Sequence, residues 1–209
     1  MKFFDKYLIT LIISLIIGSV TLTAYSQEFV QPHNEEILEK DFTSNNLSNN
    51  RLETFELRAK QKVGDFINYL EIISDKSYDL SFREYAIETA LKLFSSKNCM
   101  VNDFDINTGE QKLFNIKQYL LMFFKSKYSK INTKTENISI VNHLENNNSV
   151  YVGTITYSQN ITGHSNTETV IDKTSIKKIG ITLKKVEKKF GNHKKNVWEV
   201  MLCNIEKQE

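Results

Sequence analysis

The chain has 209 residues with a formal charge of +2 at pH 7, and its single Pro and seven Gly leave little room for long irregular segments. Its two Cys and four His are too few and too widely spaced for a zinc site. The charge is divided unevenly, because residues 27–110 hold 9 Lys and Arg against 16 Asp and Glu whereas residues 111–209 hold 16 against 8, so we expect an electrically polar molecule.

Residues 1–26 have the pattern of a secretory signal peptide. Lys2 and Lys6 precede an apolar run built around LITLIISLIIGSV, and AYS then offers small residues for cleavage. An uncleaved membrane anchor is the alternative, because the uncharged stretch is just long enough to span a bilayer. The sequence therefore predicts an exported protein, periplasmic or secreted. Export would place Cys99 and Cys203 in an oxidising compartment, either as a disulfide or as separate buried thiols.

Helices are expected after a disordered tether at residues 27–50, whose segment DFTSNNLSNN has little to bury. From Arg51 onward, apolar residues recur at steps of three and four, which predicts an amphipathic helix. Ser81 and Glu84 match a capping box for a second helix. A short strand and an Asn-Thr-Gly turn follow at CMVNDFDINTGE. Asn115 then caps a third helix, whose aromatic residues indicate burial on several sides.

The remaining residues alternate with a period of two and predict four strands joined by polar turns at ENNN, NITGHSN and GNHKK. Gly153 and Gly180 lie inside strands, where we expect bulges or bends that curve the sheet. The apolar last strand should be interior, with a partner on each side. Together these elements predict one α+β domain over residues 51–209, in which about three N-terminal helices pack on a curved four-stranded antiparallel sheet.

Three segments of the second half carry a resemblance to a known family: VYVGTITYSQNITG, VIDKTSIKKIGITLKK and WEVMLCNI. They resemble exported bacterial proteins of the nuclear transport factor 2-like superfamily, the cone-shaped fold that includes ketosteroid isomerase. Such proteins tend to end on Trp-x-Val-x-Leu-Gly-Asp-Ile, and Cys203 and Asn204 replace Gly-Asp here. The resemblance covers residues 51–206 and implies a cone-shaped fold more than a shared activity.

The cone of that superfamily would enclose a pocket between sheet and helices. Aromatic side chains from the first and third helices and from two strands are the candidates to line it, and they would suit an apolar or flat ligand. The alternative is that they form the core, since aromatic stripes dominate protein interiors. The candidates are Phe66, Tyr69, Tyr119, Tyr151, Tyr157 and Trp198.

Acid or base catalysis in such a pocket would need a buried carboxylate or His beside a Tyr donor. Asp65, Asp103 and His143 are the candidates, although Asp103 and Asp105 also read as turn residues. No nucleophile elbow, phosphate loop or metal motif is recognisable in the sequence. We therefore expect no cofactor and no metal, and we name no catalytic residue.

Nine Lys and one Glu lie between Lys173 and Lys195, on what should be one hairpin. This density favours an anionic partner, whereas the alternative is that Lys protects an exposed strand edge from other sheets. The absence of Arg clusters and exposed aromatic platforms argues against nucleic acid. The candidate surface consists of Lys177, Lys178, Lys184, Lys185, Lys188 and Lys189.

These patterns lead to two functional hypotheses. The first is an exported, non-enzymatic binding or protein-interaction domain, monomeric or homodimeric, with a protein or small-molecule ligand in the cell envelope. The second is a small-molecule enzyme, of isomerase or dehydratase type, that uses the cone pocket. An open pocket with an inward carboxylate would favour the enzyme.

Overall fold

The computed structural model describes residues 47–165 and 168–208. The predicted signal peptide and residues 27–46 of the predicted tether lie outside this range. Residues 47–50, the end of that tether, belong to the folded unit. Leu47 is buried and its backbone N–H donates to the Tyr151 hydroxyl at 3.0 Å, and the first helix begins at Asn49.

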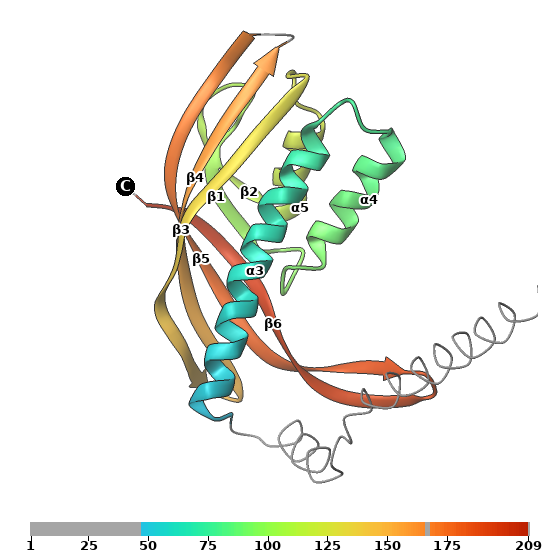
Figure 1. Ribbon diagram of the computed structural model, residues 1–209, viewed down its shortest axis with the longest axis vertical. Coiled ribbons are helices and arrows are strands. Elements are labelled where there is room, and N and C mark those ends of the chain that lie inside the picture. Colours follow the sequence, from blue (N-terminus) through green and yellow to red (C-terminus); the bar gives the residue numbers. More distant parts are fainter. Residues whose placement is uncertain (1–46, 166–167, 209) are drawn as a thin grey trace, which may run out of the picture. The chain divides into compact units, whose positions relative to one another are not determined.

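Three helices and six strands follow one another within the described residues (Figure 1). Helices α3 and α4 come first, strands β1 and β2 form a short hairpin, and α5 precedes four long strands. Their bounds are α3 Asn49–Ser74, α4 Leu80–Leu91, β1 Met100–Phe104, β2 Gln111–Asn115, α5 Ile116–Phe124, β3 Lys130–Asn147, β4 Val150–Ser165, β5 Glu168–Phe190 and β6 His193–Lys207.

All six strands form one sheet in the order β2-β1-β6-β5-β4-β3. Neighbouring strands are antiparallel except β1 and β6, which are parallel and pair Val101 with Ile205. The prediction of a four-stranded antiparallel sheet behind three N-terminal helices is therefore wrong. The error arose because β1 and β2 are too short to show a clear alternation, and a parallel pairing between distant segments leaves no local pattern. The prediction for the last strand is confirmed, since β6 lies between β1 and β5.

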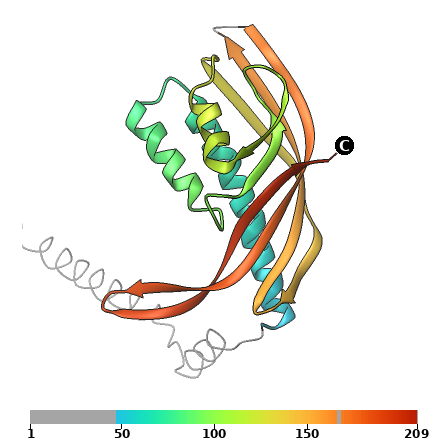
Figure 2. The same ribbon diagram turned by 180° about the vertical axis from the view of Figure 1, so that it is seen from behind.

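The helices lie together on one side of the curved sheet (Figures 1 and 2). The apolar stripe of α3 is buried as its periodicity predicts, with Ala59, Val63 and Leu70 fully enclosed. The predicted capping box at Ser81 does not form, because the N-cap of α4 is Asp79, two residues earlier. The predicted Asn115 cap is confirmed: its side chain accepts from the Gln118 N–H at 2.8 Å, while the Gln118 side chain accepts from the Asn115 N–H.

Bulges occur beside both strand glycines, with the extra residue in the neighbouring strand. Opposite Gly153, strand β3 carries an additional residue, and a Cβ on this glycine would lie 2.9 Å from the Asn142 carbonyl oxygen. Opposite Gly180, strand β6 carries the extra residue at Cys203 and Asn204, and the Asn204 side chain accepts from the Met100 N–H of β1 at 2.9 Å. The absent side chains thus let neighbouring strands approach and bend.

Candidate functional site

A buried ion pair lies on the inward face of the sheet. Asp103 points inward from β1, and Lys177 points inward from β5, where odd-numbered residues from Ser175 to Leu183 are buried. The Lys177 ammonium pairs with Asp103 Oδ1 across the intervening strand β6, and both side chains are 1 % exposed. Burial of two charges costs free energy unless each charge is compensated by a partner. This pair is therefore a polar site inside an otherwise apolar core.

Two further donors hold the Asp103 carboxylate in place. The Tyr119 hydroxyl of α5 donates to Oδ2 at 2.8 Å, and the Phe104 backbone N–H donates to Oδ1 at 2.8 Å. Burial and the nearby Asp103 charge raise the pKa of Tyr119 well above its usual value, and the same two causes raise the pKa of Tyr157. Both phenols therefore stay protonated, so Tyr119 acts as a hydrogen-bond donor.

The Lys177 ammonium has fewer compensating partners than the Asp103 carboxylate. Burial lowers its pKa, the Asp103 charge opposes that shift, and the positive charge of Lys207 adds to it. Lys207 lies directly opposite Lys177 in the β5–β6 ladder. Among the described residues, nothing besides Asp103 compensates the charge of this ammonium. Asp103 is thus the single counter-charge that the described residues offer to this buried ammonium.

Further buried polar residues lie beside Lys177 on the same face of the sheet, and we call Tyr157, Lys177, Gln159 and Ser175 the polar strip. Tyr157 and Lys177 are directly opposite one another in β4 and β5, and the next inward pair is Gln159 and Ser175. Gln159 is 1 % exposed and Ser175 is 9 % exposed. The Gln159 amide nitrogen and the Ser175 hydroxyl are both buried without a hydrogen-bond partner in the structure. A buried polar atom without a partner costs free energy, which suggests that a ligand or ordered water satisfies it.

A cleft of about 390 Å³ opens beside this strip. Lys173 closes one side, with its ammonium 4.6 Å from the centre of the Phe104 ring. Gly109 is in the β1–β2 turn with φ of +81°, where a Cβ would lie 3.8 Å from the Lys173 ammonium. The positive φ of the turn favours glycine at this position, whereas a Cβ there would make only ordinary van der Waals contact with the lysine. The lining residues are Phe104, Gly109, Gln111, Lys173, Thr174, Ser175 and Lys207.

The aromatic residues proposed to line a pocket are packed together instead. Phe66 stacks on Tyr119 with ring centres 6.4 Å apart, and Tyr151 meets Trp198 edge-on at 5.5 Å. These four and Tyr157 are buried in the core cluster, and Tyr69 is partly buried against it. The structure thus brings the candidates into the core, and the cleft lies elsewhere, at the end of the polar strip.

Of the three residues considered for acid or base chemistry, Asp103 is buried. Asp65 is exposed on α3. His143 is exposed and its Nδ1 lies 3.1 Å from the Glu56 carboxylate. Asp105, the other turn candidate, accepts the Asn107 N–H at 2.9 Å in the β1–β2 turn. Asp103 alone among them combines burial with a Tyr donor.

The six lysines proposed as an anionic-partner surface do not share one environment. Lys177 is buried, whereas its neighbour Lys178 points to the opposite face of the sheet. Lys184 and Lys185 are half-buried, and Lys188 and Lys189 are exposed near the end of the β5–β6 hairpin. The cleft lysines Lys173 and Lys207 were not among the candidates, nor were Gln159 and Ser175. The available signal was a charged residue at position 177, in phase with the inward apolar positions Ile179 and Ile181.

The two cysteines are free thiols brought together by the bulge of β6. The Ser95 hydroxyl lies 3.5 Å from Cys99 Sγ and 3.2 Å from Cys203 Sγ. The hydrogen bond from the Cys203 thiol lowers the pKa of Cys99 to about 6, and this same interaction together with burial raises the pKa of Cys203. The pair therefore shares one proton, with Cys99 as the more acidic sulfur.

Within residues 47–165 and 168–208, no group of three or more His, Cys, Asp or Glu is arranged to hold a metal ion. In that same part of the chain, no helix combines the length and apolar content that crossing a membrane requires. Comparisons with protein-family models, curated proteins and solved structures found no match. The resemblance to the nuclear transport factor 2-like superfamily therefore stays a prediction, and the site has to be interpreted from its own chemistry.

Proposed function

We propose that this protein is a binding domain for a small anionic molecule, a carboxylate or a phosphate ester, held in the cleft beside the Asp103–Lys177 pair. One observation carries the proposal: Lys173, Lys207 and Ser175 line the same cleft, and the Ser175 hydroxyl is buried without a hydrogen-bond partner. Lysine and a serine hydroxyl together offer hydrogen-bond donors and positive charge to an anion.

The size and the lining of the cleft support a small ligand. Its volume of about 390 Å³ falls in the range of pockets for small molecules. Phe104 offers one aromatic surface, whereas Gln111 and Thr174 offer polar groups. Gln159, whose buried amide nitrogen has no hydrogen-bond partner, is paired with the cleft residue Ser175 across strands β4 and β5. This combination suits an anionic group attached to a flat or apolar body.

The enzyme hypothesis keeps one specific observation in its favour. Asp103 is a buried carboxylate with the Tyr119 hydroxyl at 2.8 Å, which matches the buried carboxylate beside a Tyr donor that this hypothesis expects. However, Lys177, Tyr119 and the Phe104 N–H already occupy this carboxylate. A base in that position would have to give up a strong partner before accepting a proton. We therefore place binding first and proton transfer by Asp103 second.

The test is calorimetric titration of the protein with inorganic phosphate and, separately, with benzoate. We expect at least one of these anions to bind. The double variant K173Q/K207Q should bind it at least about tenfold more weakly, because a hydrogen bond to a charged group contributes about 1.5–3 kcal/mol. The matched control K92Q/K97Q removes two exposed lysines outside the cleft and should leave the affinity unchanged. Binding that persists undiminished in K173Q/K207Q, or no binding of either anion, would reject the proposal.

Ser175→Ala separates a ligand contact from a purely structural role. Without ligand, removal of an unpartnered buried hydroxyl should leave the free energy of unfolding unchanged or slightly higher. With ligand, the same variant should bind the anion more weakly. A variant that is destabilised without ligand, and binds normally, would show that the hydroxyl belongs to the fold alone.

A further inference from the structure

The far end of the β5–β6 hairpin extends beyond the rest of the sheet. Figures 1 and 2 show the two strands continuing past their neighbours as a two-stranded ribbon. We call residues 184–199 the arm. Its strands stay paired from Lys184 opposite Glu199 to Phe190 opposite His193. Every residue from 187 to 196 is exposed, on both faces of the ribbon. A two-stranded ribbon without a core of its own is only marginally stable in water, which suggests that the arm contacts a partner.

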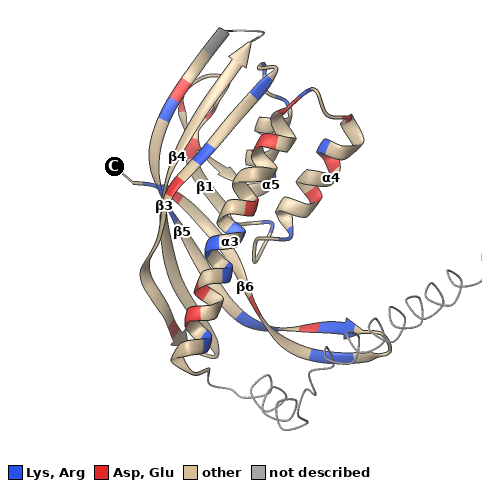
Figure 3. Cartoon of the chain, viewed as in Figure 1, with Lys and Arg blue, Asp and Glu red and all other residues tan. Residues whose placement is uncertain are grey.

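The arm is strongly basic. It holds six Lys, two Glu and no Arg, a formal charge of +4 with its His neutral, and Figure 3 shows the blue segments along it. Some of the lysines have acidic neighbours, since Lys188 lies 3.0 Å from Glu199 and Lys194 lies 2.9 Å from Glu187. Exposed pairs of this kind are weak, so they leave most of the positive field available to a partner.

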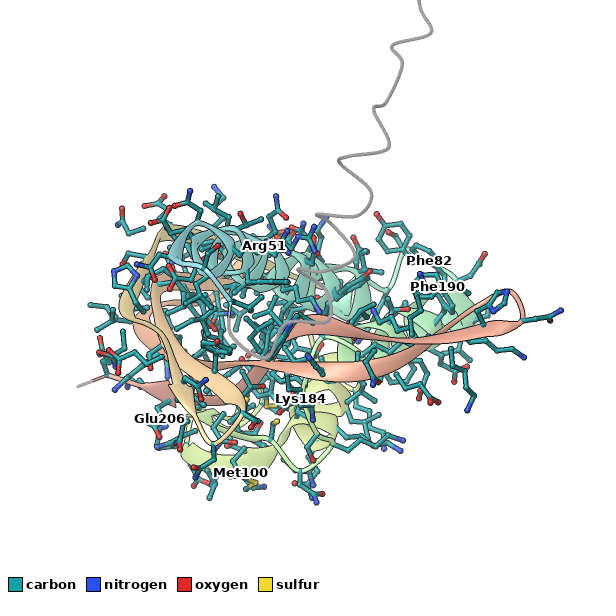
Figure 4. All side chains as sticks on the ribbon, turned by 90° about the horizontal axis from the view of Figure 1, so that it is seen from below. Arg51, Phe82, Met100, Lys184, Phe190 and Glu206 are labelled. Atoms are coloured by element: carbon teal, nitrogen blue, oxygen red, sulfur yellow. The ribbon has the colours of Figure 1, made fainter. Side chains whose placement is uncertain are left out.

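The tip combines this charge with an exposed aromatic ring. Phe190 is 53 % exposed and begins the turn at Gly191, near the end of the ribbon in Figure 4. Directly behind it, Lys189 and Lys194 form the next cross-strand pair. Val186 and Val197 form a half-buried pair on the same face as Phe190. An apolar tip surrounded by lysines matches the order of layers at a membrane surface, where phosphates lie outside the acyl chains.

We propose that the arm docks on an anionic lipid surface, with Phe190 entering the interface and the lysines of residues 188–195 contacting lipid phosphates. The positive charge of the arm favours an anionic membrane over a neutral one. Each lysine near an anionic membrane surface strengthens binding about fivefold. Nucleic acid fits less well. The arm has no Arg, and its single exposed aromatic ring provides no platform on which successive bases could stack.

The experiment places a reporter at the tip of the full chain. In Phe190→Trp, the new indole should show a blue shift and quenching by brominated lipid on vesicles that contain phosphatidylglycerol. Both effects should be weak on pure phosphatidylcholine and should disappear at about 1 M salt, where charges are screened beyond about 3 Å. The unsubstituted protein is the control, since its single Trp198 is 6 % exposed at the base of the arm and should not be quenched. This readout reports the tip itself, whatever the other parts of the chain do on the vesicle.

Charge variants in the Phe190→Trp background identify the lysines. K188Q/K189Q/K194Q/K195Q should weaken docking on phosphatidylglycerol vesicles several hundredfold, at about fivefold per lysine. The matched control K92Q/K97Q/K117Q/K134Q removes four exposed lysines outside the arm and should dock as before. The proposal is overturned if the tip is not quenched, if quenching is equal on phosphatidylcholine, or if both variants behave alike. Retention of a single-stranded oligonucleotide by the arm lysines, without quenching by lipid, would also overturn it and would identify nucleic acid as the partner.

Discussion

Strands β5 and β6 place lysines in two regions with opposite surroundings. On the inward face of the sheet, Lys177 of β5 is buried and is held by Asp103 of β1, two strands away. Along the arm, no other element of the described residues covers residues 187–196, and the lysines there are exposed. The same residue type in the same two strands thus serves the fold in one region and is available to a partner in the other. The two regions differ in burial. A buried charge must be paired to offset its desolvation, whereas an exposed charge is solvated by water.

The largest expected effect comes from breaking the buried pair. Lys177→Ala should lower the free energy of unfolding by about 3–5 kcal/mol, because it leaves the Asp103 carboxylate buried without its counter-charge. Urea unfolding followed by circular dichroism measures this. Lys189→Ala in the arm is the matched control and should change stability by no more than about 0.5 kcal/mol.

The double variant D103N/K177M sharpens that comparison. Because both charges are removed together, it should recover much of the stability that K177A loses. Equal losses in K177A and K189A would show that burial does not distinguish the two regions. A double variant as unstable as K177A would show that the pair is not the source of the loss.

A smaller effect is expected at the phenol beside the pair. Tyr119→Phe removes the donor to Asp103 and should cost about 1–3 kcal/mol. Tyr85→Phe on the exposed side chain of α4 should cost almost nothing. A difference below about 0.5 kcal/mol between these two variants would contradict the assigned hydrogen bond.

The buried phenols also predict a pH dependence. The pKa values of Tyr119 and Tyr157 are raised in the folded state, so their contribution to stability is fully present below about pH 10 and is lost as the pH rises above it. Above about pH 10 the unfolded chain releases these protons and the folded chain keeps them. Stability should then fall by about 1.4 kcal/mol per pH unit for each phenol. Urea unfolding above pH 10 should show a smaller slope in Tyr157→Phe than in the unsubstituted protein.

The thiol pair at the β6 bulge should give a measurable shift without a large change in stability. The hydrogen bond from Cys203 lowers the pKa of Cys99 to about 6. Alkylation of Cys99 by a small reagent should therefore reach half its maximal rate near that pH. In Cys203→Ala the midpoint should move up toward about 8.5, the usual value for a free thiol. An unchanged midpoint would show that Cys203 is not the donor.

The smallest effect is expected in the arm. Lys194→Ala removes the exposed pair with Glu187 and should change the free energy of unfolding by about 0–1 kcal/mol. Hydrogen exchange provides the regional counterpart, because amides of residues 187–196 should exchange much faster than those of residues 179–183. Equal protection in the two segments would contradict the description of the arm as a ribbon without cover.

Local patterns predicted a large part of the fold. The spacing of Ala59, Val63 and Leu70 places them on one face of a helix in any environment, and Asn115 caps α5 through groups three residues apart. The bulges beside Gly153 and Gly180 were likewise accessible, because a missing side chain permits close approach of a neighbouring strand. The parallel contact of β1 with β6 was not accessible, since its partners are about a hundred residues apart and leave no periodic trace.

The candidate site shows the same division. The density of lysines along the β5–β6 hairpin predicted an anionic partner, although Lys177 alone of the six candidates lies near the site. Only the order of the strands decided that the Asp103 carboxylate would reach Lys177 across β6, and that Ser175 and Lys207 would share a cleft. Helix stripes, caps and strand alternation depend on neighbours within a few residues, so the sequence by itself determined them. Burial of a charge depends on which distant segment covers it, and that was decided by the tertiary structure.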